Sequence, residues 1–198
     1  MAYVRPQAMA VRTQQERSAA TQGRLLDATI DCLVDLGYAG ASTTAICARA
    51  GVSRGAQLHH YPTKAELVAA AIERLFAERH REFRETLPAQ PDLPRALAAL
   101  WKIYTGKTFY AWAELLVASR TDRELRAHLR RVDDAFFAQA KVTCRALLGA
   151  RAADEGQIAG LARLVLSMLD GLALNHTLGG RDASSRAALA ELGRLLGA

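Results

Sequence analysis

The stretch from residue 42 to 64 constrains the fold most, because its spacing fits two short helices joined by a tight turn. Ser42 or Thr43 can cap the first helix, since a hydroxyl at a helix start accepts a hydrogen bond from a free backbone amide. Gly51 can end that helix in the left-handed conformation without steric cost. Ser53 can then cap the second helix. A helix of about two turns needs support from its neighbours in water, and its outward face is left free for another purpose.

The charge of this stretch distinguishes it from an ordinary helical hairpin. No carboxylate lies between Asp35 and Glu66, whereas Arg49, Arg54, Lys64 and two histidines do. Proteins bind DNA largely by displacing counterions with lysine and arginine, while a solvated helical surface usually mixes both signs. We therefore predict a DNA-binding helix-turn-helix, with a structural hairpin of incidental charge as the alternative.

The spacing also predicts which side chains meet DNA. Arg54, Gln57 and His59 are expected to face the major groove, since arginine donates twice to guanine and glutamine both donates to and accepts from adenine. The amide end of the helix starting near Thr43, together with His60 and Lys64, is expected to hold phosphates. The full predicted DNA-binding set is Thr43, Thr44, Ser53, Arg54, Gly55, Gln57, His59, His60 and Lys64.

These residues resemble the N-terminal signature of the tetracycline-repressor (TetR) family. The matching residues are Thr43–Thr44, Ile46–Cys47–Ala48, Ala50–Gly51–Val52–Ser53, Gly55, His59–His60–Tyr61–Pro62 and Lys64–Ala65–Glu66–Leu67. The resemblance covers residues 24–72 and extends further only in length and helix content. It implies a repressor that binds an inverted-repeat DNA operator as a homodimer and is released by a small effector. Leu58 stands where the family usually has a tyrosine, and Gln57 where it has an apolar residue, so the tyrosine's phosphate contact cannot be transferred to Leu58.

The distribution of proline predicts an all-α chain in two parts. Pro88, Pro91 and Pro94 interrupt a sequence whose long proline-free segments are rich in alanine and leucine. We predict about nine helices, arranged as an N-terminal three-helix helix-turn-helix domain and a larger helical effector-binding and dimerisation domain. The predicted segments are a flexible arm at 1–16, the DNA-binding domain at 17–72 with a linking helix to about 87, and the second domain at 88–198. The arm either enters a minor groove or is a disordered terminus.

Five of the twelve aromatic residues lie between positions 101 and 112. Such a cluster can line a pocket for a small, apolar or aromatic effector, because ligand sites are mostly apolar with a few polar groups. Ordinary core packing is the competing interpretation, and Asp170 can orient an effector, meet a partner helix or form a buried polar pair. The predicted ligand-binding residues are Trp101, Tyr104, Tyr110, Trp112, Phe136 and Asp170.

The last two predicted helices, at 154–178 and 183–196, carry apolar residues for a second subunit. The first of them is apolar on more than one side, so one face can pack inward while another meets a partner. The family resemblance implies a four-helix dimer interface made by these two helices of each chain. The predicted interface residues are Leu161, Val165, Leu169, Leu172, Leu189 and Leu192.

Several function classes lack sequence support. No glycine-rich phosphate loop, metal-ligand spacing or nucleophile motif is present, so we expect no enzyme, no cofactor and no metal site. Cys32, Cys47 and Cys144 lie unpaired in helical patterns, which favours small buried hydrophobes over redox sensors and fits a cytoplasmic protein. Arg163 and Asp170 break the most apolar stretch, so no membrane span is expected. The remaining alternatives are a DNA-binding regulator or architectural protein without an effector, and a helical protein-interaction module. The residues leave open whether regulation is positive or negative.

Overall fold

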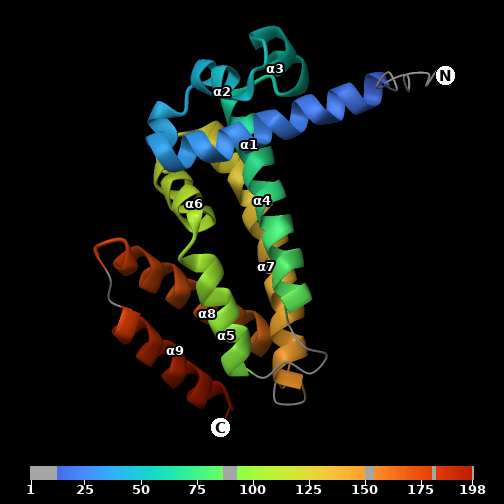
Figure 1. Cartoon of the computed structure of the whole chain (residues 1–198). Helices are drawn as coiled ribbons and strands as arrows, with labels where there is room; N and C mark the ends of the chain where they lie inside the picture. The colour runs from blue at the N-terminus through green and yellow to red at the C-terminus, as the bar shows by residue number, and fades with distance from the viewer. Residues whose placement is uncertain (1–12, 87–92, 150–153, 180–181, 198) are drawn as a thin grey trace, which may run out of the picture.

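The computed structural model describes residues 13–86, 93–149, 154–179 and 182–197, which form nine α-helices and no strand (Figure 1). The helices are α1 (Gln14–Gly40), α2 (Thr43–Ala50), α3 (Arg54–His60), α4 (Lys64–Thr86), α5 (Leu93–Tyr104), α6 (Lys107–Ala118), α7 (Arg123–Leu148), α8 (Glu155–His176) and α9 (Asp182–Gly197). The predicted all-α fold is confirmed in these residues. Most of the predicted N-terminal arm, residues 1–12, lies outside them.

The start and the break of α1 follow from local sequence. Thr13 and Glu16 form a capping box, in which each side chain accepts a hydrogen bond from the other residue's backbone N–H. Residues 14–16, predicted to belong to the arm, are therefore helical. Gly37 has φ 66° inside α1 and interrupts the helix there. An added Cβ at Gly37 would lie 2.8 Å from Glu114 Oε2, so this carboxylate would have to shift, and the positive φ itself favours glycine.

One core joins α1 and α2 to the beginning of α4, and Val52 and Tyr61, which flank α3, pack against it. Leu25 and Leu33 of α1, Ile46 of α2 and Leu67 of α4 are fully buried within it. The same core continues into α6 and α7 through Leu115 and Leu125 and neighbouring residues, so the two predicted parts share apolar packing. The short helices α2 and α3 are thus held by this shared packing and not by their own length.

The other end of the molecule is built from α5, α8, α9 and the ends of α4 and α7 (Figure 1). A second core there contains Tyr104, Phe109, Leu166, Leu169 and Leu189. Helices α4 and α7 run side by side from the end carrying α1 to the opposite end. Both helices therefore connect the two ends of the molecule.

Helix α8 is, among the described helices, the one long and apolar enough to cross a membrane. Three of its apolar residues, Ile158, Leu166 and Leu169, are buried against the rest of the protein. The helix contacts α5, α7 and α9.

Candidate DNA-binding and effector sites

The turn between α2 and α3 has the geometry of a helix-turn-helix. Ser42 caps α2 by accepting a hydrogen bond from the Ala45 N–H at 3.1 Å, so the cap is Ser42 and not Thr43. Gly51 ends α2 with φ 61°, in the left-handed region. Ser53 then caps α3 by accepting from the Ala56 N–H at 3.2 Å. These three local devices match the prediction from the sequence.

Helix α3 presents Arg54, Gly55, Leu58 and His59 to solvent, and we call these four residues the reading face. Successive helical residues are about 100° apart, so Leu58 projects between Arg54 and Gly55, near the centre of this face. His60 is half-buried, and its ring meets that of His59 edge to face, with centroids 5.2 Å apart. The predicted outward positions of Arg54, Gly55 and His59 are therefore observed.

Gln57 is buried, with no exposed surface, and the prediction that it reads a base is wrong. Its Oε1 accepts a hydrogen bond from Arg54 Nη1 at 2.6 Å, and its Nε2 donates to the Tyr61 carbonyl at the end of α3. A buried amide must satisfy its hydrogen bonds within the protein, which fixes its direction. Gln57 therefore ties the end of α3 to the side chain of Arg54.

Lys64 also turns inward, so the prediction that its side chain holds a phosphate is wrong. Its ammonium donates to the Tyr38 carbonyl and lies 3.9 Å from the centroid of the Tyr38 ring. Burial lowers the pKa of Lys64, with the nearby Asp122 charge opposing the shift. The lysine joins the first turn of α4 to the end of α1.

Lys64 is part of a polar cluster around Tyr38, which we call the Tyr38 junction: Tyr38, Lys64, Glu114 and Asp122. The Tyr38 N–H donates to Glu114 Oε2 at 3.2 Å, and its hydroxyl donates to Asp122 Oδ2 at 2.8 Å. Burial and the hydrogen bond to Asp122 raise the pKa of Tyr38, so it stays protonated. The junction connects α1 and α4 to α6 and to the start of α7.

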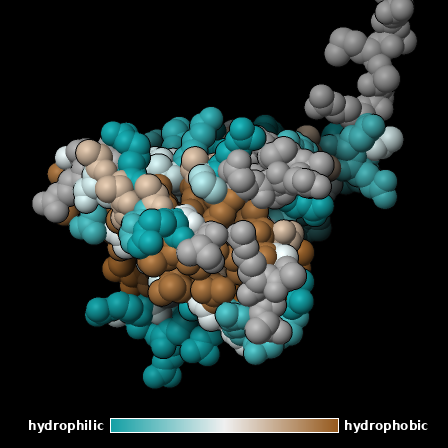
Figure 2. Space-filling model, turned by 90° about the horizontal axis from the view of Figure 1, so that it is seen from below, coloured by the Kyte–Doolittle hydropathy of each residue, from teal (hydrophilic) through white to brown (hydrophobic). Residues whose placement is uncertain are grey.

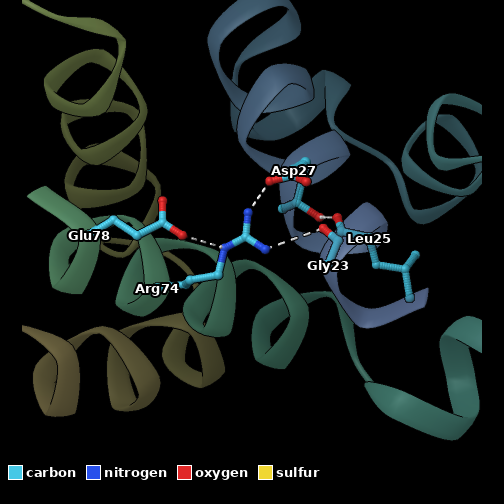
Figure 3. Close-up of polar contacts among 6 residues, drawn as sticks. Gly23, Leu25, Asp27, Arg74 and Glu78 are labelled. Carbon is cyan, nitrogen blue, oxygen red and sulfur yellow. Dashed lines mark hydrogen bonds and ion pairs between the residues drawn. The ribbon is translucent and has the colours of Figure 1, made fainter. Parts of the chain in front are cut away.

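Arg74 makes a second link between α4 and α1 (Figure 3). Its Nη2 pairs with Asp27, and its Nη1 donates to the Gly23 carbonyl at 3.4 Å. On its own helix, the Nε lies 3.3 Å from Glu78 Oε1. Arg74 therefore fixes α4 against α1.

An apolar cavity lies between α4, α5, α7 and α8. Seen from below, the end of the molecule that holds this cavity carries a cluster of hydrophobic side chains on its surface (Figure 2). Tyr104 and Phe136, both predicted ligand-binding residues, line it. From α4 it also receives Arg79, His80 and Phe83, which the sequence analysis missed. A helical wheel could have found His80 and Phe83, because they follow Phe76 by four and seven residues and so lie on the same side of α4.

The other predicted ligand residues do not line this cavity. Trp112 borders an adjoining smaller space with Phe136, and its ring meets that of Phe76 edge to face at 5.1 Å. Trp101, Tyr110 and Asp170 are absent from the described lining of both spaces, and their role as ligand contacts stays a prediction. Burial, followed by the charge of Asp133, raises the pKa of Asp170 to about 6.

Among the polar groups that line the cavity, His80 is the best placed to form a hydrogen bond with a ligand. Its Nε2 is buried and has no hydrogen-bond partner. Burial, with the charge of Arg84 adding to it, lowers the pKa of His80, so the ring is neutral at pH 7. Cys144 also lines the cavity, and burial raises the pKa of its thiol. The site can therefore accept an apolar molecule carrying one hydrogen-bonding group.

The predicted dimer residues are mostly used inside the protomer. Leu169, Leu189 and Leu192 are 0%, 8% and 7% exposed, so their prediction as partner contacts is wrong. Leu161, Val165 and Leu172 are half-buried, and Val165 lines the cavity. Helix α5 packs onto α8 and α9 and covers the apolar sides of these helices that were predicted to meet a partner subunit.

A different side of α8 is open, and we call Gly160, Leu164, Gly171 and Leu174 the open face of α8. Leu164 and Leu174 are 58% and 53% exposed. A Cβ added at Gly160 or Gly171 would meet nothing within 4 Å. The spacing of four, seven and three residues places all four on one side of the helix. Leu178, just after α8, and Leu195 of α9 are also exposed.

Comparisons with known proteins agree with this architecture. The family model described as bacterial regulatory proteins, tetR family, matches residues 25–71, and the model described as BetI-type transcriptional repressor, C-terminal, matches residues 106–198. An uncharacterized HTH-type transcriptional regulator of Mycobacterium tuberculosis is 37% identical over 167 residues, covering 82% of this chain and 86% of its own. The HTH-type transcriptional regulator CymR of Pseudomonas putida is 38% identical over 124 residues, 61% of each chain.

Solved structures share the fold. A transcriptional regulator from Rhodococcus sp. Rha1 has a TM-score of 0.66 at 26% identity, covering 88% of this chain and 92% of its own. A putative transcriptional regulator from Saccharomonospora viridis, solved in complex with choline, has a TM-score of 0.67 at 18% identity, covering 87% of this chain and 95% of its own. Both agree with the arrangement of nine described helices.

Proposed function

Since this chain belongs to the TetR family of bacterial DNA-binding transcriptional regulators, we propose that it is a repressor that binds an inverted-repeat operator as a homodimer and releases it on binding a small, largely apolar effector. DNA binding is assigned to α1–α3. Effector binding and dimerisation are assigned to α5–α9. The protein is proposed to act in the cytoplasm. The observation that carries the proposal is the reading face of α3, which is exposed within a segment free of carboxylates.

Arg54 and His59 supply the hydrogen-bonding groups of the reading face. Gln57 holds one terminal nitrogen of Arg54, which leaves the rest of the guanidinium to donate to a guanine in the major groove. Thr44 is exposed in the first turn of α2, where backbone amides can meet phosphate oxygens. His60 is half-buried behind the face and can contribute to the same backbone contact.

Gly55 supports close approach of DNA to α3. Glycine weakens a helix by about 1 kcal/mol relative to alanine. Nothing inside the protein requires it, because an added Cβ would meet no atom within 4 Å and the backbone is helical. A residue without a side chain on the reading face lets the helix axis lie close to the edges of the bases.

The open face of α8 supports the dimer. A single helix-turn-helix with a few phosphate contacts binds weakly at cellular salt, and two-fold symmetry doubles the contacts. Leu164 and Leu174 offer uncovered apolar surface, and Gly160 and Gly171 allow two helices to approach closely. A second copy of α8 and α9 would cover this surface, and the operator would then be an inverted repeat.

Helix α4 supports coupling between effector and DNA. At one end it carries His80 and Phe83 into the cavity, and at the other it is fastened to α1 by Arg74 and Lys64. An effector that shifts α4 would therefore move α1–α3 and change the separation of the two reading faces in the dimer. Effectors of this kind usually change the free energy of DNA binding by about 1–3 kcal/mol.

The proposal is tested by selecting bound sequences from random DNA and titrating the enriched operator with wild type and Arg54→Ala. We expect an inverted repeat, and a loss of about 1–3 kcal/mol in Arg54→Ala with relaxed preference at one base pair of each half-site. Arg81→Ala is the matched control, because Arg81 is an exposed arginine on α4 away from the reading face. Failure to enrich any sequence, or equal binding by wild type and Arg54→Ala, would overturn the proposal.

A further inference from the structure

Leu58 is an exposed apolar residue at the centre of the reading face. It is 44% exposed, and no other large apolar side chain of α2 or α3 is exposed to that degree. Burying a leucine side chain fully stabilises a folded protein or a complex by about 1.5–3 kcal/mol. Because Leu58 is only partly buried in the free protein, part of this stabilisation can still be gained on binding. The side chain is therefore available for contact with a partner.

The neighbours of Leu58 decide what kind of contact it can make. Arg54 lies one turn before it, and His59 follows it on the same exposed side. Gly55, three residues earlier, has no side chain and leaves Leu58 uncovered on that flank. The reading face is thus an apolar group placed between hydrogen-bonding groups.

Only one apolar group is presented by the bases in the major groove, namely the 5-methyl group of thymine. A leucine cannot donate a hydrogen bond to a phosphate oxygen, so the sugar-phosphate backbone offers it no polar contact. Resting on the proposed function, we propose that Leu58 contacts a thymine 5-methyl group and makes the protein select thymine at that position of each half-site.

The position of this thymine relative to the Arg54 contact follows from helix geometry. Four residues rise about 6 Å along a helix, and base pairs are spaced about 3.4 Å along DNA. The thymine therefore lies within about two base pairs of the guanine bound by Arg54. This places both contacts in one half-site and makes the proposal specific enough to test base by base.

The experiment replaces thymine by deoxyuridine, which differs only by lacking the 5-methyl group. In the selected operator, each thymine of the half-site is replaced in turn, symmetrically in both halves, and binding is followed by fluorescence anisotropy. One replacement near the Arg54 contact should weaken wild type about fourfold per half-site, from the burial of one methyl group. The remaining thymines should tolerate the change.

Leu58→Ala should weaken binding to the thymine operator and show no further loss with deoxyuridine at that position. Leu58→Met, which keeps an apolar side chain of similar size, should restore the sensitivity. Leu116→Ala is the control, because Leu116 is a leucine on α6 with similar exposure, 42%. It should behave as wild type with both DNAs.

Three results would overturn the proposal. Sensitivity to deoxyuridine that persists unchanged in Leu58→Ala would mean that another residue reads the methyl group. An equal loss for thymine and deoxyuridine operators in Leu58→Ala, with wild type insensitive, would place Leu58 on the DNA backbone. Unchanged binding by Leu58→Ala would remove it from the interface. In each case Arg54→Ala still loses affinity if the proposed function holds, whereas failure to enrich any operator overturns both proposals.

Discussion

Replacing Tyr38 by phenylalanine removes one hydroxyl from the Tyr38 junction and little else. The hydroxyl donates to Asp122 Oδ2 at 2.8 Å, while Asp122 Oδ1 accepts from the Leu125 N–H at 2.9 Å and so caps α7. The phenylalanine ring keeps its place beside the Lys64 ammonium, and the backbone N–H keeps its bond to Glu114. The variant therefore isolates the contact between the end of α1 and the start of α7.

The expected loss in unfolding free energy is about 1–2 kcal/mol. A hydrogen bond to a charged group contributes about 1.5–3 kcal/mol net. Asp122 is half-buried, so water can partly replace the lost hydroxyl, and the carboxylate keeps the Leu125 N–H. The hydrogen bond from the Leu125 N–H, and to a smaller extent the one from the Tyr38 hydroxyl, lower the pKa of Asp122 below its ordinary value. These considerations place the expected loss at the lower end of the range.

Urea unfolding at pH 7 measures this loss, and a double-mutant cycle with Asp122→Asn assigns it to the pair. Asparagine still caps α7 but carries no charge, so Tyr38→Phe should cost less in that background. Tyr110→Phe is the matched control, since its hydroxyl forms no hydrogen bond in the described structure. A Tyr38→Phe protein as stable as wild type, or an equal loss in the Asp122→Asn background, would refute the reasoning.

Three further outcomes follow from the site geometry. Burial and Asp133 raise the pKa of Asp170 to about 6, above the ordinary 3.8, so its ionised form destabilises the fold as pH rises. Asp170→Asn should thus add about 2–3 kcal/mol to the unfolding free energy at pH 7 and little at pH 4, measured in urea. Leu164→Glu should give folded monomers, seen by size-exclusion chromatography, that bind the operator weakly in fluorescence anisotropy. Leu169→Glu should instead lower the melting temperature, because Leu169 is fully buried. His80→Phe should keep operator affinity, because His80 lies in the cavity and not on the reading face. The variant should lose the thermal shift that apolar alcohols, acids and amides cause, because it lacks the free Nε2, and should keep the shift caused by hydrocarbons of matched size.

Local rules predicted the helix-turn-helix well. Ser42, Gly51 and Ser53 act through their own backbone and the next turn, so their roles can be read from neighbouring residues alone. The break at Gly37 is of the same kind. Helix number and type were predictable for the same reason, since proline and the apolar period are local signals.

Side-chain direction depended on packing that the sequence does not display. Gln57 is polar and was expected outside, but the Tyr61 carbonyl and Arg54 satisfy its amide within the protein. Lys64 was expected on DNA, but the Tyr38 ring and carbonyl attract its ammonium. The partner of Lys64 comes from another part of the chain, whereas those of Gln57 lie within one turn of it, and burial decides that its amide turns to them.

The effector cavity and the dimer surface were misjudged for a related reason. Whether Phe83 on the apolar side of α4 fills the core or lines a cavity depends on how the neighbouring helices are placed. The leucines of α8 were known, but which side α5 and α9 would cover depends on tertiary packing. Leu169 was therefore predicted at the partner surface, whereas Leu164 is the exposed residue.

The claim that this regulator reads a two-fold symmetric operator through α3 is tested most directly by one affinity ratio. Wild-type protein is titrated, at physiological salt, with the selected inverted repeat, with the same DNA after scrambling one half-site, and with fully scrambled DNA. A dimer with two reading faces should bind the intact repeat at least about 10³-fold more tightly than fully scrambled DNA, and scrambling one half-site should remove most of that preference. Equal affinity for all three DNAs would contradict the claim.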